Sequence, residues 1–293
     1  MVQTSVKKRH RKAYRINRTV KKVLSIFGRC LICLIFAFPF YWMIITSLKT
    51  YQESIQNPPT LWPQVFDLSG YVTVLTKMNL GMYFKNSIII IIAVMAIQMV
   101  VMVPASYAFA KYDFKGKKLM FAMVLVANMT PTVITFIPIY IMFAKMNIGG
   151  RKILTTLWPQ ILPFGANAFG IFLLRQSFMQ IPEEIIEAAR LDNTSEKGIM
   201  FKIMLPMSKA TMATIALFSF VANWNAYFWP LVMCRTEEVK PIILAIASLK
   251  ELEVGLIWPT IMAGNTLVVL PILILFAIAS KKIIASMAYR GVK

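Results

Sequence analysis

The sequence has few of the side chains that carry out chemistry in soluble enzymes. Its 293 residues include 12 acids, one histidine and three cysteines, and only 15% of the residues are charged. His10 lies among lysines and arginines, which argues against a histidine-based metal or catalytic site. Cys30, Cys33 and Cys234 are too few for a disulfide framework, so we expect them to be packing residues.

Two further absences bear on function. No G-x-x-x-x-G-K-S/T sequence occurs, so the chain cannot hold a nucleotide in a P-loop. The long apolar stretches contain no acid, whereas ion-coupled carriers place Asp, Glu or His inside the membrane. A transporter built this way would need energy from another polypeptide. An ion-coupled carrier and a membrane enzyme are the less favoured alternatives.

Long apolar runs dominate the sequence instead. Hydrophobic residues make up 58% of the chain, and the mean hydropathy is +0.66. Several runs reach the roughly 20 residues that a helix needs to cross a bilayer. They predict an all-α, polytopic membrane protein with an uncleaved first span. The six predicted spans are residues 27–48, 87–109, 119–143, 154–174, 210–232 and 259–280.

The net charge of +20 is explained by membrane topology, because nothing in the sequence resembles a groove-reading motif for nucleic acid. With six spans, 23 of the 32 Lys and Arg residues fall on the side that holds both termini. Cytoplasmic segments carry this excess, which predicts N-in, C-in topology. The basic tail 1–26 would then lie near anionic lipids, with the tail 281–293 on the same side.

Residues 181–206 form a charged stretch between two apolar spans, and the predicted topology places them in the cytoplasm. They carry five of the twelve acids. Pro182 suits the first position of a helix, and Glu183 and Glu184 would complement the helix dipole. Asp192 and Asn193 predict a turn, because Asn tolerates the left-handed conformation.

A second helix is expected after this turn. Thr194 or Ser195 can cap it. We expect it to run to about Met204 and to stop before Pro206, where the fifth span would begin. The whole stretch therefore predicts a helix, a turn and a helix that acts as a lever, held at a membrane surface.

The sequence Glu187-Ala188-Ala189, followed at matching spacing by Ile203-x-Leu205-Pro206, resembles the EAA loop of permease subunits of ATP-binding-cassette importers. The family has Gly where this chain has Asn193. Both residues tolerate a positive φ, so we expect the turn to be kept.

Other segments are similar to carbohydrate-importer permeases, in particular to the smaller, six-span permease of the maltose importer. Ala105–Gly116 is similar to their loop after the second span, and Trp224–Leu231 to their W-N-x-F-x-x-P-L segment. An acidic residue is common in the family where Ala226 stands. The last residues, Gly291–Lys293, are similar to their terminal tail.

This resemblance implies a type I importer fold and a set of partners. These are a second permease chain in a heterodimer, two ATPase subunits that use ATP and Mg, an extracytoplasmic solute-binding protein and a sugar substrate. The chain itself would bind no cofactor. The residues implied in ATPase docking are Glu184, Glu187, Ala188, Ala189, Asp192, Asn193, Gly291, Val292 and Lys293.

Polar residues in the predicted spans are candidates for a substrate pathway, although such residues also form hydrogen bonds between membrane helices. Trp224 and Trp229 could stack on a sugar ring or anchor the chain at the membrane interface. Disaccharides, longer oligosaccharides, uronic-acid polymers and other solutes such as sugar phosphates or peptides stay open as cargo. The candidate pathway residues are Asn128, Asn167, Asn223, Asn225, Tyr227 and Asn265.

Overall fold

The computed structural model describes residues 2–249 and 257–288, and helices make up most of this part of the chain. The all-α class is confirmed. The strands described are β1 (Asn147–Ile148) and β2 (Arg151–Lys152), a short antiparallel pair. The helices are α1 (Val2–Ser47), α2 (Tyr51–Ser54), α3 (Ser69–Lys77), α4 (Leu80–Lys111), α5 (Lys117–Met129), α6 (Thr132–Lys145), η1 (Ile153–Thr155), α7 (Trp158–Ile161), η2 (Leu162–Phe164), α8 (Ala168–Met179), α9 (Glu183–Leu191), α10 (Glu196–Gly198), the π-helix η3 (Ile199–Met204), α11 (Leu205–Met207), α12 (Lys209–Trp224), α13 (Phe228–Met233), η4 (Glu237–Val239), α14 (Ile242–Ala247) and α16 (Trp258–Ala288).

Among the residues that the structure describes, three helices are long and apolar enough to cross a bilayer: Lys21–Ser47 within α1, the whole of α4, and Trp258–Ala277 within α16. They overlap the first, second and sixth predicted spans. Helix α4 begins earlier than the predicted residue 87, because the Asn79 side chain accepts a hydrogen bond from Met82 N at 3.2 Å and caps the helix.

The third predicted span is bent. Helices α5 and α6 meet at an angle of 94°. The break falls at Thr130 and Pro131, both of which have extended backbones. A proline disfavours the helical conformation of the residue before it, so Pro131 explains the bend between α5 and α6.

The fourth predicted span, residues 154–174, is divided into short pieces, which are η1, α7, η2 and the first part of α8. Pro159 and Pro163 each lie in the first turn of a new short helix, where a missing N–H costs nothing. Asn167 then caps α8 by accepting a hydrogen bond from Gly170 N at 2.8 Å. Up to five spans can be counted in the described part of the chain if α5 with α6, and Glu196–Met207 with α12, are each taken as one bent span.

Two compact units make up the chain. The first contains α1, α2, most of α3 and the start of α16. In it, the buried carboxylate of Glu53 accepts hydrogen bonds from Thr60 Oγ1 at 2.6 Å and Gln64 N at 3.0 Å, which folds the connection after α1. A Cβ added to Gly70 would come within 3.0 Å of the Pro259 carbonyl oxygen, so glycine lets α3 and α16 approach closely.

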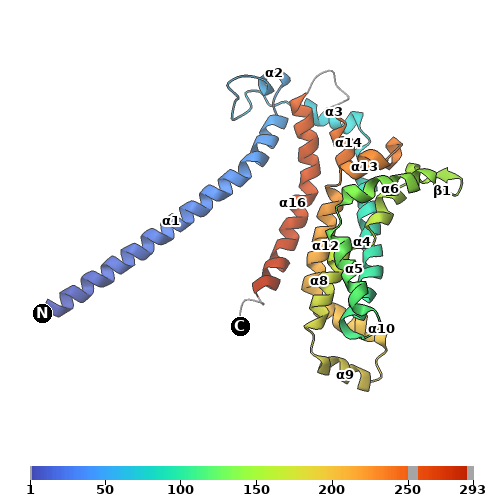
Figure 1. Cartoon of the computed structure of the whole chain (residues 1–293). Helices are drawn as coiled ribbons and strands as arrows, with labels where there is room; N and C mark the ends of the chain where they lie inside the picture. Colours follow the sequence, from blue (N-terminus) through green and yellow to red (C-terminus); the bar gives the residue numbers. More distant parts are fainter. Residues whose placement is uncertain (1, 250–256, 289–293) are drawn as a thin grey trace. The chain divides into compact units, whose positions relative to one another are not determined.

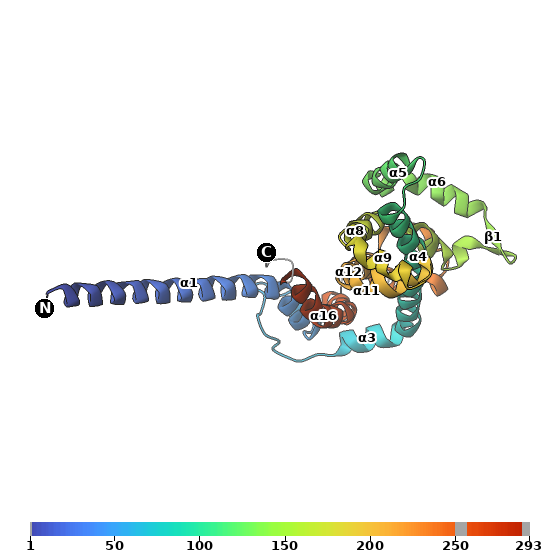
Figure 2. The ribbon, with the colours of Figure 1, turned by 90° about the horizontal axis from the view of Figure 1, so that it is seen from below.

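The second unit is a helix bundle that contains every element from α4 to α14 and the rest of α16. Helix α4 packs against α8 and α12, and α5 packs against α8 (Figure 1). Helix α9 lies across one end of this bundle, as the view from below shows (Figure 2). This bundle carries the charged loop and most of the candidate pathway residues.

Candidate functional site

Helix α9 forms the first part of the charged loop. It begins one residue later than predicted, because Pro182 is the N-cap residue and Glu183 is the first helical residue. Glu183 and Glu184 both lie in the first turn, as expected. Each carboxylate there stabilises the helix by about 0.3–1 kcal/mol through the helix dipole.

The turn after α9 has the predicted left-handed residue. Asn193 has a φ of 55°. Asn193 N donates to Arg190 O at 3.0 Å, and Thr194 N donates to Ala189 O at 3.0 Å. These two hydrogen bonds form a Schellman motif, which satisfies the last carbonyls of the helix. Asn193 thus adopts the left-handed conformation at the position where the family pattern has Gly.

The second helix of the loop differs from the prediction at its far end. Ser195 Oγ accepts a hydrogen bond from Gly198 N at 3.3 Å and provides the expected cap. The predicted stop before Pro206 is wrong. The helical segment continues through η3 and α11 to Met207, because Pro206 lies in the first turn of α11 and needs no donor there. The chain then turns by 80° at Ser208 into α12.

The two faces of α9 have different surroundings. Ile186 and Ala189 are buried in an apolar cluster with residues of α4, α8 and η3. Ala189 is only 8% exposed, because its side chain faces the bundle, and its implied part in ATPase docking stays a prediction. Its position three residues from Ile186 turns both side chains toward the bundle.

The outer face of α9 is a stripe of exposed side chains, Glu184, Glu187, Ala188 and Leu191, which we call the outer stripe. Their spacing of three, four and seven residues places them on one side of the helix. Leu191 is 83% exposed and was missed in the sequence analysis. Its spacing from Glu187 and Ala188 is the signal that would have identified it.

The five acids of the loop divide into two groups. Glu183 forms an ion pair with Lys111 at 2.8 Å, and Glu196 forms one with Arg190 at 3.0 Å. The other three acids, Glu184, Glu187 and Asp192, have no ion-pair or hydrogen-bond partner for their carboxylates within residues 2–249 and 257–288. Gly291, Val292 and Lys293 lie outside the described residues.

Three of the candidate pathway residues line one open cavity of about 490 Å³ in the bundle. They are Asn128 near the end of α5, Asn167 at the start of α8 and Asn223 on α12. Asn225 and Tyr227 are exposed at the break between α12 and α13 and do not line this cavity. Asn265 lies on α16 in the other unit.

A chain of amide and hydroxyl groups crosses the wall of the cavity. Gln98 on α4 donates to Phe164 O at 2.8 Å and accepts from Ser219 Oγ at 2.8 Å. The Asn223 amide donates to Ser219 O at 2.7 Å. Gln98 and Ser219 were missed in the sequence analysis, although a lone glutamine in the apolar second span was a visible signal.

The described residues that line the cavity include no acid, lysine, arginine or histidine. Hydrogen-bonding capacity remains, because the Asn128 amide has no partner among the described residues. Aromatic rings complete the walls. Trp229 packs edge-on against Phe136 and Phe164 with 5.3 Å between ring centroids in each pair, and Trp224 is buried outside the cavity.

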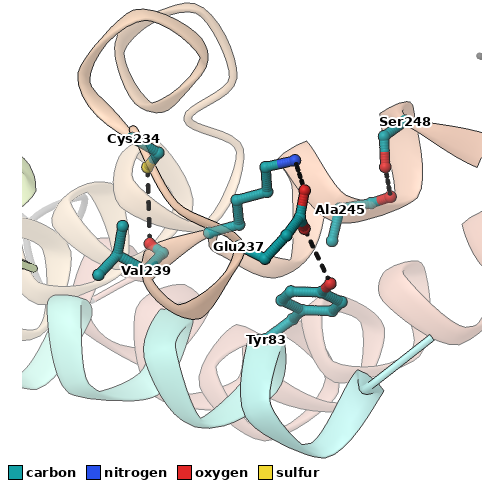
Figure 3. Close-up of polar contacts among 7 residues, drawn as sticks. Tyr83, Cys234, Glu237, Val239, Ala245 and Ser248 are labelled. Carbon is teal, nitrogen blue, oxygen red and sulfur yellow. Dashed lines mark hydrogen bonds and ion pairs between the residues drawn. The ribbon is translucent and has the colours of Figure 1, made fainter. Parts of the chain in front are cut away.

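At the end of the bundle opposite α9, the segment after α13 is fastened to the start of α4 (Figure 1). Tyr83 donates a hydrogen bond to Glu237 Oε2 at 3.1 Å, and Glu237 also pairs with Lys240 (Figure 3). Asn86 donates to the carbonyl oxygens of Glu238 and Lys240 at 2.8 and 3.0 Å. Helix α4 thus contacts the loop after α13, the cavity and the region of α9.

No three His, Cys, Asp or Glu side chains within the described part of the chain come together in a way that could hold a metal ion. The polar residues of the cavity are neutral amides and hydroxyls, which bind by hydrogen bonding. The arrangement is therefore suited to holding a neutral, hydroxyl-rich molecule between apolar walls and to receiving a protein partner at the outer stripe.

Comparison with known proteins gives consistent matches over most of the chain. The arabinooligosaccharides transport system permease protein AraQ of Halalkalibacterium halodurans is 30% identical over 91% of this chain and 94% of its own length. The lactose transport system permease protein LacG of Rhizobium radiobacter is 29% identical over 85% of this chain and 89% of its own.

A solved structure has the same fold. It is the crystal structure of a bacterial ABC transporter involved in the import of the acidic polysaccharide alginate. One of its chains aligns with a TM-score of 0.78 and 22% identity, over 89% of this chain and 96% of that one. The importer-permease fold expected from the sequence is confirmed. Residues 102–288, more than half of the chain, match one family model, and the protein belongs to that family, the binding-protein-dependent transport system inner membrane components.

Proposed function

We propose that this chain is one membrane-spanning subunit of an ATP-driven carbohydrate importer. A second permease chain, two ATPase subunits and an extracytoplasmic solute-binding protein complete the machine. Family membership makes the chain a transport component and not an enzyme, with ATP hydrolysis supplied by separate subunits. The names of the relatives AraQ and LacG, which refer to sugar uptake, carry the assignment to carbohydrate.

The cavity between α5, α8 and α12 is the proposed part of the pathway that this chain supplies. Its amides offer both donors and acceptors, which match sugar hydroxyls, and its aromatic rings match the apolar faces of a sugar. The uncharged lining of about 490 Å³ favours neutral oligosaccharides. Uronic acids, sugar phosphates and peptides would bring charge against walls with no described counter-charge, so another solute is the second candidate.

The outer stripe of α9 is the proposed docking surface for the ATPase. Glu184 and Glu187 are available to basic groups on a partner, and Ala188 allows a close approach beside Leu191. Gly291–Lys293 are proposed to reach the ATPase as well. This arrangement goes with six spans, cytoplasmic termini and a prokaryotic plasma membrane, with tail 1–26 near anionic lipid.

Co-purification and solute-stimulated ATP hydrolysis test this proposal. The chain is expressed with its candidate permease partner, ATPase and binding protein, and the complex is reconstituted in liposomes. We expect a stable complex whose hydrolysis rises with one class of neutral oligosaccharide. Stimulation by sugar phosphates or peptides alone would favour the second candidate. Uptake by the chain without any ATPase would contradict the proposal.

A further inference from the structure

The segment Ala105–Gly116 resembles the loop after the second span of carbohydrate permeases, but no role has been assigned to it so far. In the structure it forms the end of α4 and the turn before α5. Side chains from this segment reach both ends of α9. The contacts at each end are specific, and their partners come from the charged loop.

At the start of α9, the contact is made by Lys111. Its side chain is only 7% exposed, and Nζ donates to Glu183 Oε2 at 2.8 Å and to Ile181 O at 3.1 Å. An amine that is largely withdrawn from water needs such partners. Lys111 therefore holds both the backbone before α9 and a carboxylate of its first turn.

At the end of α9, the contact is made through Glu196. This carboxylate accepts hydrogen bonds from the buried Tyr107 hydroxyl of α4 and from Arg190 Nε, the latter at 3.0 Å. The ring of Tyr112 stands edge-on to Tyr107, with 5.6 Å between their centroids. One carboxylate thus joins the end of α4, the last turn of α9 and the start of α10.

The middle of α9 is held by packing. Ile186 is fully buried in the apolar cluster that includes Met102, Val103 and Tyr107 of α4. Helix α9 is therefore fixed to α4 at its start, middle and end. The covalent route from α9 to the fifth span is less direct, since it passes through a π-helix and an 80° turn before α12.

Helix α4 is suited to carry a displacement over a long distance. It has 32 residues and continues through Pro104, which at 1.5 Å per residue gives a length of about 48 Å. Gln98 places it in the wall of the cavity. Tyr83 attaches it to the loop after α13 (Figure 3), and so does Asn86.

We propose that Tyr107, Lys111 and Glu196 are positioning residues that couple α9 to α4, so that movement of α9 is transmitted along the second span to the cavity. This inference rests on the proposed function of α9 as the element moved by an ATPase. It gives Tyr107 and Lys111, two residues of the resembling segment, a role in transmission. In this proposal the three acids without an ion pair contact the ATPase. The two paired acids, Glu183 and Glu196, transmit the movement of α9 to α4.

The test measures ATP hydrolysis and sugar uptake in the same proteoliposomes containing the complete transporter. The variants are Tyr107→Phe, which removes one oxygen atom, and Lys111→Met, which keeps most of the apolar stem. We expect each to hydrolyse ATP while the amount of sugar moved per ATP falls roughly tenfold, as follows from losing a hydrogen bond to a charged group. The double variant should lose more.

The matched control is Asp113→Asn. Asp113 pairs with Lys117 at the same end of α4, and its side chain is fully exposed at 100%. This variant should keep the wild-type ratio. A charge swap, Lys111→Glu with Glu183→Lys, should restore part of the ratio that Lys111→Glu alone removes, because the ion pair forms again while the hydrogen bond to Ile181 O does not.

The outcomes separate the inference from the function on which it rests. If the wild-type complex shows no ATP-dependent uptake, the proposed function fails. If the wild type transports and Tyr107→Phe and Lys111→Met keep its sugar-to-ATP ratio, only the inference is overturned. Equal losses of hydrolysis and uptake in well-assembled variants would place these residues in docking and would also overturn it.

Discussion

The charged loop around α9 and the cavity in the bundle are both polar, but they are built from different groups. The loop carries five carboxylates, whereas the described lining of the cavity has amides and hydroxyls only. A carboxylate that water can reach costs little free energy, whereas burying one in an apolar bundle costs a large free energy unless it is paired. The difference supports the proposal that the loop meets a charged protein surface and that the cavity takes a neutral ligand.

Charge added to the outer stripe should have the largest effect. Ala188→Asp places an unpaired carboxylate where a partner must approach closely, and Ala188 is exposed, so the fold is kept. We expect loss of ATPase co-purification and a fall in solute-stimulated hydrolysis of more than about tenfold. Glu187→Lys should act in the same direction.

The control for the outer stripe is Lys197→Ala, which removes an exposed charge on α10 outside the stripe. It should stay within about twofold of wild type, since isolated surface charges contribute little. If both Ala188→Asp and Glu187→Lys hydrolyse ATP at the wild-type rate, α9 is not the docking element.

Charge added to the cavity should have the next largest effect. Asn167→Asp keeps the cap on α8, because Asp caps as well as Asn, but it puts a carboxylate into the lining. We expect uptake of a neutral oligosaccharide to fall about tenfold while ATPase co-purification is unchanged. Asn225→Asp makes the same change outside the cavity and should transport normally. Equal behaviour of the two variants would mean that the cavity is not the pathway.

Substitutions of Asn193 test the loop side of this comparison, because they change the backbone strain in the turn after α9. Asn193→Val should destabilise the turn by about 1–2 kcal/mol, because a β-branched residue is unfavourable at a φ of 55°. Asn193→Gly should be neutral or slightly stabilising. Rates of limited proteolysis between α9 and α10 measure the effect. Val and Gly variants with equal cleavage rates would be inconsistent with the left-handed turn.

Acid should have the smallest effect within the physiological range. Hydrogen bonds from Tyr107 and Tyr112, together with Arg190, hold the pKa of Glu196 below the ordinary value of a glutamate. Because this pKa is lowered in the folded protein, the contribution of the Glu196 carboxylate to holding the loop is fully present above the ordinary glutamate pKa. It is lost as the pH falls through the lower pKa of the folded protein. A spin label at Leu191 should keep the same mobility from pH 5 to 8 and become more mobile only at a pH below the ordinary glutamate pKa of about 4.3.

The variant Glu196→Gln checks this pH prediction. Its label mobility should be raised at neutral pH and nearly flat on acidification, since the titrating carboxylate is gone. Increased mobility of the wild-type label already between pH 7 and 5 would show that a different group controls the loop.

The loop was predictable from sequence because its signals are local. The acidic first turn, the Asp192-Asn193 turn and the Ser195 cap depend on neighbours within a few residues, and the structure has all three. Two details depended on more distant contacts. Ala189 faces the bundle because of packing with α4 and α8. The helix continues past Pro206 to Met207 and breaks at Ser208, whose hydroxyl is hydrogen bonded to Ser177 of α8.

The cavity was less predictable because it joins residues that are far apart in the chain. Gln98, Asn167 and Asn223 come from three helices, and hydropathy alone gives no indication of which amides meet. The bent third span and the divided fourth span also escaped a reading based on apolar length, although Pro131, Pro159 and Pro163 were visible breaks. Three of the six candidate residues, Asn128, Asn167 and Asn223, line the cavity, and their role in a substrate pathway stays a prediction.

The most direct test of the account is the energy source of uptake by the reconstituted complex. Proteoliposomes are loaded with ATP and Mg, given binding protein and a labelled neutral oligosaccharide outside, and compared with vesicles that hold no ATP but have an imposed proton or sodium gradient. The account predicts uptake that requires ATP and is abolished by Ala188→Asp. Uptake driven by an ion gradient without ATP, and unaffected by Ala188→Asp, would contradict it.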